Sequence, residues 1–161
     1  MIKKTITEQK RERVSLIILF LLALVLSNLG IPGMADSTIM PNYFIALIIT
    51  LILNRLGNLN LYKLVIFGLI IDLFVGQLLG QYGFIFICIS LGDYIIKKAL
   101  FIKNEKQVIT LISLLTLISF IALCGSSLSH GIFISPKIIF LQTILTFILC
   151  LILNFFIKKI F

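Results

Sequence analysis

Six apolar segments follow one another along this chain, and short polar turns separate them. They are residues 14–29, 39–53, 64–79, 82–96, 107–124 and 138–157. Apolar runs of this kind are typical of helices that cross a lipid bilayer, because a helix on the surface of a soluble protein keeps a polar face. The composition agrees, since 60% of the residues are hydrophobic and only 12% are charged, outside the usual range of soluble globular proteins. We therefore predict an all-α integral membrane protein with six transmembrane helices.

The basic residues predict how these helices are oriented. With a cytoplasmic N-terminus and six crossings, Lys137 is the only one of the 14 Lys and Arg residues on the outer side. Basic residues concentrate in the cytoplasmic loops of membrane proteins. The short third and fourth segments could instead form one long tilted helix or a re-entrant pair, but merging them would export the lysines of residues 97–106. The charges therefore favour six spans with both termini in the cytoplasm.

The polar residues outside these segments are too few for a second domain. Residues 1–13 form a basic tail on the cytoplasmic side, and residues 14–161 form the membrane domain. The tail either orients the first helix, which we favour, or binds the anionic inner leaflet or a cytoplasmic partner. No clear small-x-small cleavage site follows the first apolar run, so we predict a retained helix and not a signal peptide. The net charge of +8 is a topology signal and gives no reason to expect nucleic acid.

No residue pattern predicts catalysis, a metal site or a cofactor site. His130 is the only histidine and lies in an outer loop, so a metal ion there would lack further ligands. The serines beside it lack the Gly-x-Ser-x-Gly turn and the carboxylate partner of a serine hydrolase. Asp93 precedes Lys97 by one helical turn, which predicts an ion pair near the inner boundary. We therefore expect a protein that is not an enzyme.

One acidic residue stands alone in an uncharged apolar run near the middle of the chain. This residue is Asp72, and Gly68, Gly76 and Gly80 recur at four-residue spacing around it. On a continuous helix these four residues form one stripe of small side chains, which lets another helix approach closely. A carboxyl group inside a membrane faces protein or water, and no second buried acid or base is available to relay a proton. We favour helix packing or partner binding at Asp72 over the handling of ions or protons.

Three motifs between residues 40 and 83 are similar to those of a known family. Met-Pro-Asn-Tyr at residues 40–43 opens one segment, Gly-Leu-Ile-Ile-Asp-Leu at residues 68–73 lies in the next, and Gly-Gln-Leu-Leu-Gly-Gln-Tyr-Gly follows at residues 76–83. Their combination resembles MreD, the rod-shape-determining membrane proteins of bacteria. Many relatives carry arginine where this chain has Met40. The positions carried over from the family are Pro41, Asn42, Gly68, Asp72, Gly76, Gly80 and Gly83.

The resemblance to MreD implies a role without catalysis. Members of the family are membrane partners of MreC in the machinery that couples MreB filaments to peptidoglycan synthesis during elongation, beside RodA and its transpeptidase. The resemblance also implies a fold similar to the substrate-binding S-components of energy-coupling-factor transporters. The glycines and Asp72 would then receive a transmembrane helix of a partner protein.

Two functions remain open at this level. The first is a scaffold that binds MreC through helix contacts, for which Gly76→Leu or Gly80→Leu should weaken complex formation. The second is a vitamin-type S-component that binds a small molecule. S-components tend to carry paired alanines in the first helix, and this chain has only Ala23 there. We favour the scaffold.

Overall fold

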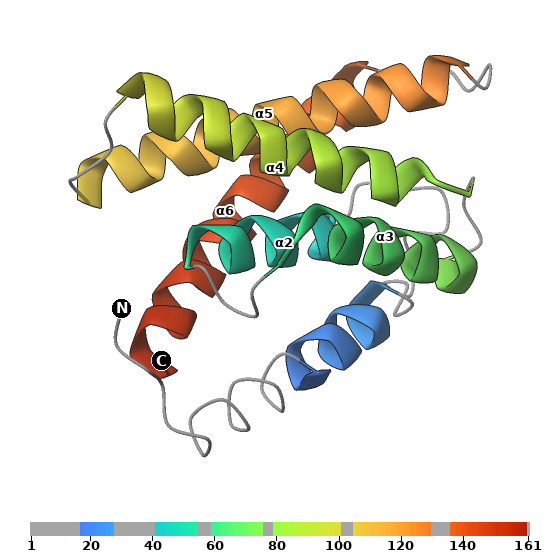
Figure 1. Cartoon of the computed structure of the whole chain (residues 1–161), viewed down its shortest axis with the longest axis horizontal. Helices are drawn as coiled ribbons and strands as arrows, with labels where there is room; N and C mark the ends of the chain where they lie inside the picture. The colour runs from blue at the N-terminus through green and yellow to red at the C-terminus, as the bar shows by residue number, and fades with distance from the viewer. Residues whose placement is uncertain are drawn as a thin grey trace.

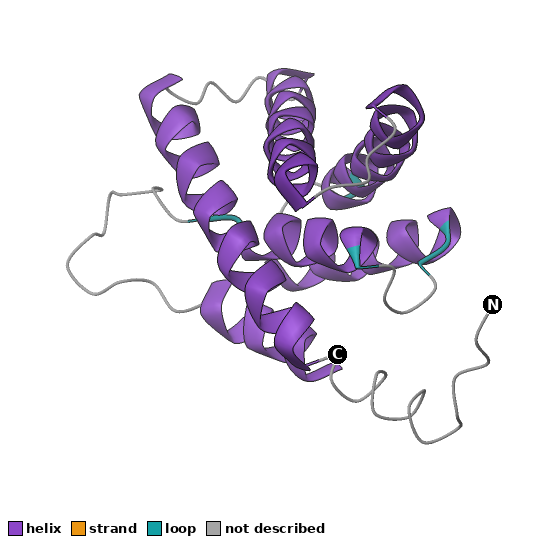
Figure 2. Cartoon of the chain, turned by 90° about the vertical axis from the view of Figure 1, so that its left-hand side faces the viewer, coloured by secondary structure: helices purple, strands orange, loops and turns teal. Residues whose placement is uncertain are grey.

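The computed structural model describes residues 17–27, 41–54, 59–75, 79–100, 105–129 and 136–160. Within these ranges every regular element is an α-helix, and Figure 2 shows no strand among them. The helices are the N-terminal helix Ile17–Ser27, α2 (Tyr43–Leu53), α3 (Leu61–Val75), α4 (Gln81–Leu100), α5 (Glu105–Ser129) and α6 (Pro136–Ile160). The predicted all-α class is confirmed, and each described helix lies at one of the six predicted segments.

The helix lengths differ from the predicted segments. Helices α4, α5 and α6 extend beyond them and have 20, 25 and 25 residues, whereas α2 has 11 and α3 has 15. Among the described residues, two stretches are long and apolar enough to cross a membrane by length and composition, Gln107–Gly125 and Lys137–Lys159. The basic tail at residues 1–13 lies outside the described residues.

Helix α2 is the centre of the bundle. Its eight consecutive residues from Phe44 to Leu51 are all buried, which requires neighbours on every side. Helices α4, α5 and α6 contact it, and the Phe20 ring of the N-terminal helix lies 6.1 Å from the Phe44 ring. Figure 1 shows α2 enclosed by these elements. A helix that is apolar on every side is found in a protein core or across a membrane, and α2 is surrounded by protein.

Helices α2 and α6 run in the same direction. Asn42, just before α2, donates its backbone N–H to Thr146 Oγ1 at 2.9 Å. Asn54, just after α2, donates Nδ2–H to Asn154 Oδ1 at 3.0 Å. The start of α2 therefore faces the earlier part of α6 and its end faces the later part. In Figure 1, α4 and α5 lie side by side in opposite directions, and α6 crosses the bundle obliquely.

Helices α3 and α4 approach each other so closely that only glycine fits at position 68. A Cβ atom added to Gly68 on α3 would lie 2.2 Å from the backbone nitrogen of Gly83 on α4 and 2.3 Å from its Cα. Both atoms belong to backbone, which cannot turn aside as a flexible side chain does. Gly68 therefore packs against α4 of the same chain, as a helix-packing residue.

The single stripe predicted on one helix is not what the chain forms. Helix α3 ends at Val75, and Gly80 lies in the following turn with φ of 91°, a conformation that glycine adopts far more readily than other residues. Gly68 and Asp72 share α3, Gly80 belongs to the turn, and Gly76 lies outside the described residues. The four-residue spacing was misleading because the turn ends the helix before the repeat is complete.

Gly68→Ala should destabilise the protein, because α3 and α4 must separate to admit the new methyl group. We expect a cost of about 1–3 kcal/mol, the usual effect of overpacking. The measurement is thermal unfolding in detergent, followed by size-exclusion chromatography.

Gly83→Ala is the matched control at the same helix contact. Its Cβ atom would meet Val65 at 3.6 Å or more, an ordinary van der Waals distance, so stability should change by less than about 1 kcal/mol. Equal losses in the two variants would contradict the observed geometry.

Candidate functional site

The Asp72 side chain binds the start of the next helix. It is 1% exposed, and both of its oxygen atoms accept hydrogen bonds from backbone. Gly80 donates its N–H to Oδ2 at 2.8 Å, and Tyr82 donates its N–H to Oδ1 at 3.1 Å. The carboxyl group that stands alone in its apolar run thus has hydrogen-bond partners for both oxygen atoms within the α3–α4 hairpin.

The position of this carboxylate follows from the chemistry of helix ends. Helix α4 begins at Gln81, and the first backbone N–H groups of any helix have no partner inside the helix. They also carry the positive end of the helix dipole, which stabilises a nearby anion. Asp72 supplies the missing acceptor and a negative charge from α3. The positive φ of Gly80 turns the chain so that both N–H groups face the carboxylate.

Tyr82 connects this contact to α2. Its hydroxyl oxygen accepts a hydrogen bond from Nδ2 of Asn42 at 2.9 Å. The other side-chain atom of Asn42, Oδ1, accepts from the backbone N–H of Ile45 at 3.1 Å, so that Asn42 is the N-cap of α2. Asparagine is among the preferred N-cap residues for this reason. One amide group therefore caps its own helix and binds a second one.

Thr146 extends the same set of contacts to α6. Its Oγ1 accepts the backbone N–H of Asn42 at 2.9 Å and donates its own hydrogen to the carbonyl oxygen of Gln142 at 2.8 Å. Thr146 is fully buried and Asn42 is 7% exposed, so water does not compete for these bonds. Four helices now meet through one connected set of hydrogen bonds. We call the four residues Asn42, Asp72, Tyr82 and Thr146 the polar network.

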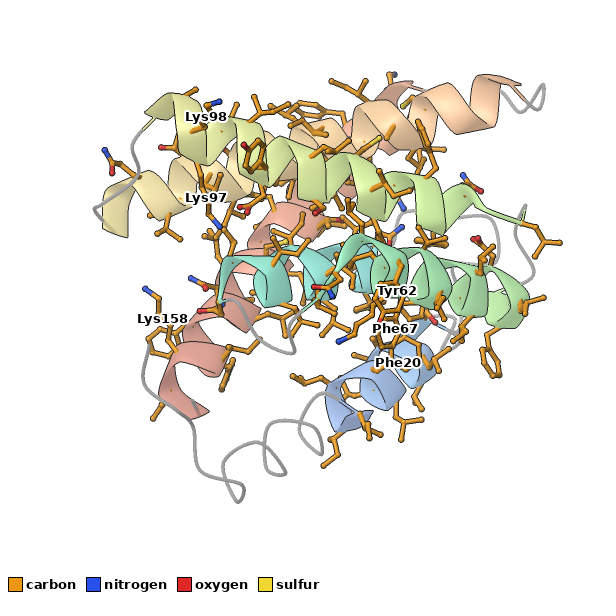
Figure 3. All side chains as sticks on the ribbon, in the orientation of Figure 1. Phe20, Tyr62, Phe67, Lys97, Lys98 and Lys158 are labelled. Carbon is orange, nitrogen blue, oxygen red and sulfur yellow. The ribbon has the colours of Figure 1, made fainter. Side chains whose placement is uncertain are left out.

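Aromatic rings link the polar network to the N-terminal helix. The ring of Phe20 lies 5.8 Å from that of Phe67 on α3 and 6.1 Å from that of Phe44 on α2. The Phe44 ring lies 5.8 Å from that of Tyr82 in an edge-to-face arrangement, and Phe86 continues the series at 5.9 Å. Figure 3 shows Phe20 and Phe67 close together. Tyr82 therefore joins the aromatic contacts of the bundle to its polar ones.

Polar contacts also occur toward the opposite end of the bundle. Lys97 Nζ and Asp93 Oδ2 are 2.8 Å apart, which confirms the predicted pair. Asn54 binds Asn154 across α2 and α6. Figure 3 shows Lys97, Lys98 and Lys158 at this end, where α4 and α6 finish.

The polar network has the geometry of a structural support. Its donors and acceptors bind one another or the backbone, and they include no hydroxyl or thiol held against a histidine. Among the described residues no group of three or more His, Cys, Asp or Glu side chains could hold a metal ion. The chemical consequence of the arrangement is that it fixes the positions of four helices.

The structure brings most of the predicted site residues together. Asn42 and Asp72 belong to the polar network, Gly80 donates to Asp72, and Gly68 packs on Gly83 immediately beside Tyr82. Pro41 precedes the N-cap and is partly buried. Whether any of these residues contacts a partner protein stays a prediction.

Two members of the network were missed by the sequence analysis. Tyr82 could have been found, because a tyrosine near the start of a helix after a glycine turn has a polar group to satisfy. Thr146 gave no such signal, since a threonine in an apolar helix usually binds only its own backbone. Its partner is Asn42, 104 residues away.

These features define a helical protein with an apolar outer surface and a buried polar network, consistent with a helical membrane protein. Over residues 8–161 the chain matches the family described as rod shape-determining protein MreD, and it belongs to that family. The resemblance drawn from its motifs is thus confirmed, and membership implies a role in rod shape determination within a family of membrane proteins not known as enzymes. No curated protein matches the chain, and no solved structure matches it either.

Asp72→Ala should destabilise the protein more than Tyr82→Phe. The first change leaves two buried backbone N–H groups without an acceptor, whereas the second leaves only one donor, Nδ2 of Asn42. An unsatisfied buried group costs about 1–3 kcal/mol, so Asp72→Ala should show the larger loss in thermal unfolding.

Tyr94→Phe serves as the control for loss of a tyrosine hydroxyl. Tyr94 is 65% exposed, and its replacement should leave the midpoint of unfolding unchanged. A loss in Tyr82→Phe as large as that in Asp72→Ala would contradict the predicted order, and an unchanged midpoint in Asp72→Ala would show that the carboxylate does not stabilise the start of α4.

Proposed function

We propose that this chain is a scaffold of the bacterial elongation machinery, without catalytic activity, that binds MreC in the cytoplasmic membrane. Its six helices cross the membrane with both termini in the cytoplasm. Through MreC it supports rod shape and lateral peptidoglycan synthesis, together with MreB, RodA and the elongation transpeptidase. The observation that carries this proposal is the family match over residues 8–161.

The directions of the helices support six crossings. The starts of α2 and α4 lie at the same end, because Asn42 binds Tyr82, and α6 runs parallel to α2. Six successive crossings place the second, fourth and sixth helices in the same direction. The lysines at the ends of α4 and α6 then fall on one side, as basic cytoplasmic residues do.

The polar network supports a scaffold role more than a small-molecule site. A ligand-binding pocket presents a few polar groups whose bonds are completed by the ligand. Here both oxygen atoms of Asp72 are occupied by backbone N–H groups of the same chain, and both side-chain atoms of Asn42 have partners. The network therefore supports a role in holding helices in place for a protein partner.

Cysteine labelling in whole cells tests the orientation. Lys98→Cys and Lys137→Cys are matched single replacements of exposed lysines, made after the natural residues Cys88, Cys124 and Cys150 have been changed to alanine. We expect a membrane-impermeant maleimide to label Lys137→Cys in intact cells and Lys98→Cys only after the membrane is opened. Labelling of both variants in intact cells would contradict the six-span topology.

Co-expression with MreC of the same organism, purified through a tag on MreC alone, tests the proposed partner. We expect the chain to co-purify in a fixed ratio. Tyr94→Phe, at an exposed position outside the candidate site, should be retained like the wild-type chain, and an unrelated tagged membrane protein should retain none.

The competing function predicts a different result. If the chain is a vitamin-binding component, a properly folded chain does not co-purify with MreC. In a screen of vitamins, the one that binds would then raise the midpoint of thermal unfolding, because a ligand that binds the folded state stabilises it.

A further inference from the structure

Helix α3 forms an edge of the bundle and presents a wide apolar surface. Within the described residues it contacts α4, and its Phe67 ring contacts Phe20 of the N-terminal helix. Seven of its large side chains are at least 36% exposed. They are Leu61, Tyr62, Ile66, Phe67, Leu69, Leu73 and Phe74. We call these residues the α3 face.

The α3 face is short compared with a lipid bilayer. Its helix has 15 residues, which at 1.5 Å per residue is about 22 Å. The hydrocarbon core of a typical bilayer is about 30 Å thick. The apolar stretch of α5 from Gln107 to Gly125 has 19 residues and is about 28 Å long. The length of α3 is thus several ångströms less than the thickness of the hydrocarbon core, whereas the apolar stretch of α5 nearly matches it.

The C-terminal part of α3 is fixed, so the helix cannot slide to make up this difference. Its first turn begins at exposed Asn60, whose carbonyl oxygen accepts the backbone N–H of Leu64 at 3.1 Å. At its end, Asp72 is bound to the start of α4, and Gly68 is locked against Gly83. Tilting the helix would only reduce the thickness that it spans.

The central helix of the bundle is shorter still. Central helix α2 has 11 residues, about 16 Å, with polar Asn42 and Asn54 bonded at its two ends. A short apolar element in a membrane is accommodated by thinning of the bilayer around it, at a cost that depends on the mismatch. Lipids with short acyl chains reduce that cost.

We propose that the α3 face is a lipid-binding edge that selects short-chain lipids and thins the bilayer locally, whereas the α5 side accepts lipids of ordinary length. This inference rests on the proposed membrane-spanning arrangement and adds a surface whose partner is the bilayer itself.

Tryptophan fluorescence tests the proposal directly, because the chain contains no tryptophan. Leu69→Trp places a probe near the middle of α3, and Leu117→Trp places a matched one near the middle of α5; the two leucines are 39% and 52% exposed. Each full-length variant is reconstituted in phosphatidylcholine with monounsaturated chains of about 14, 18 or 22 carbons. A brominated lipid in the same bilayer quenches the tryptophan, and the loss of quenching reports how well each phosphatidylcholine competes with it for the surface beside the probe.

At Leu69→Trp we expect the shortest lipid to bind at least about twofold more strongly than the longest, with no such preference at Leu117→Trp. The same chain-length preference at both positions would overturn the proposal. So would the absence of quenching at Leu69→Trp while Leu117→Trp is quenched, because α3 would then be covered by protein. Leu73→Trp, at a position that is 71% exposed, replaces the first probe if Leu69→Trp does not fold.

The scaffold proposal and the α3 edge can fail independently. Co-purification with MreC does not depend on the chain length of the surrounding lipid, so it would persist if the two probes behaved alike. Labelling of Lys98→Cys in intact cells would instead contradict the membrane arrangement on which both proposals rest.

Discussion

The contact between the Asp72 carboxylate and the start of α4 is the interaction on which the rest of the bundle depends. A carboxylate within a membrane domain is costly unless it is paired, and the first N–H groups of a buried helix are costly unless they are capped. Each group satisfies the other at 2.8 and 3.1 Å. Because the bonds join residues only eight and ten positions apart, the α3–α4 hairpin is fixed locally. The remaining helices then pack against a defined surface.

Asn42 connects the α3–α4 hairpin to α2 and α6. It caps α2, binds Tyr82 on α4 through its side chain, and binds Thr146 on α6 through its backbone. A central helix as apolar as α2 has no side-chain pattern that sets its rotation or depth. The bonds of Asn42 at one end and Asn54 at the other provide that information. In this member of a family with a role in rod shape determination, such a support keeps the arrangement of the helices fixed.

Gly68 and Gly80 have different structural roles, although their regular spacing suggested a shared one. Gly68 allows two helices to touch through their backbones, whereas Gly80 supplies a turn with positive φ and has open space around it. The first acts by its lack of a side chain and the second by its backbone freedom. Both are needed to bring Asp72 to the start of α4. The expectation that they share one surface came from treating the motif as a continuous helix.

The sequence by itself determined the helical class, the places of the helices and the family, because apolar runs, charge clusters and the Pro-Asn and Gly-Leu-x-x-Asp motifs are local features. It also singled out Asn42, Asp72 and Gly68. Only the tertiary structure decided what they bind, since Tyr82 and Thr146 come from other helices and Thr146 lies 104 residues from Asn42. The turn at Gly80 was likewise not predicted, because the four-residue spacing placed Gly80 on one helix with Gly68 and Asp72. Hydrophobicity places a residue in the membrane, whereas contact across helices decides which group it meets.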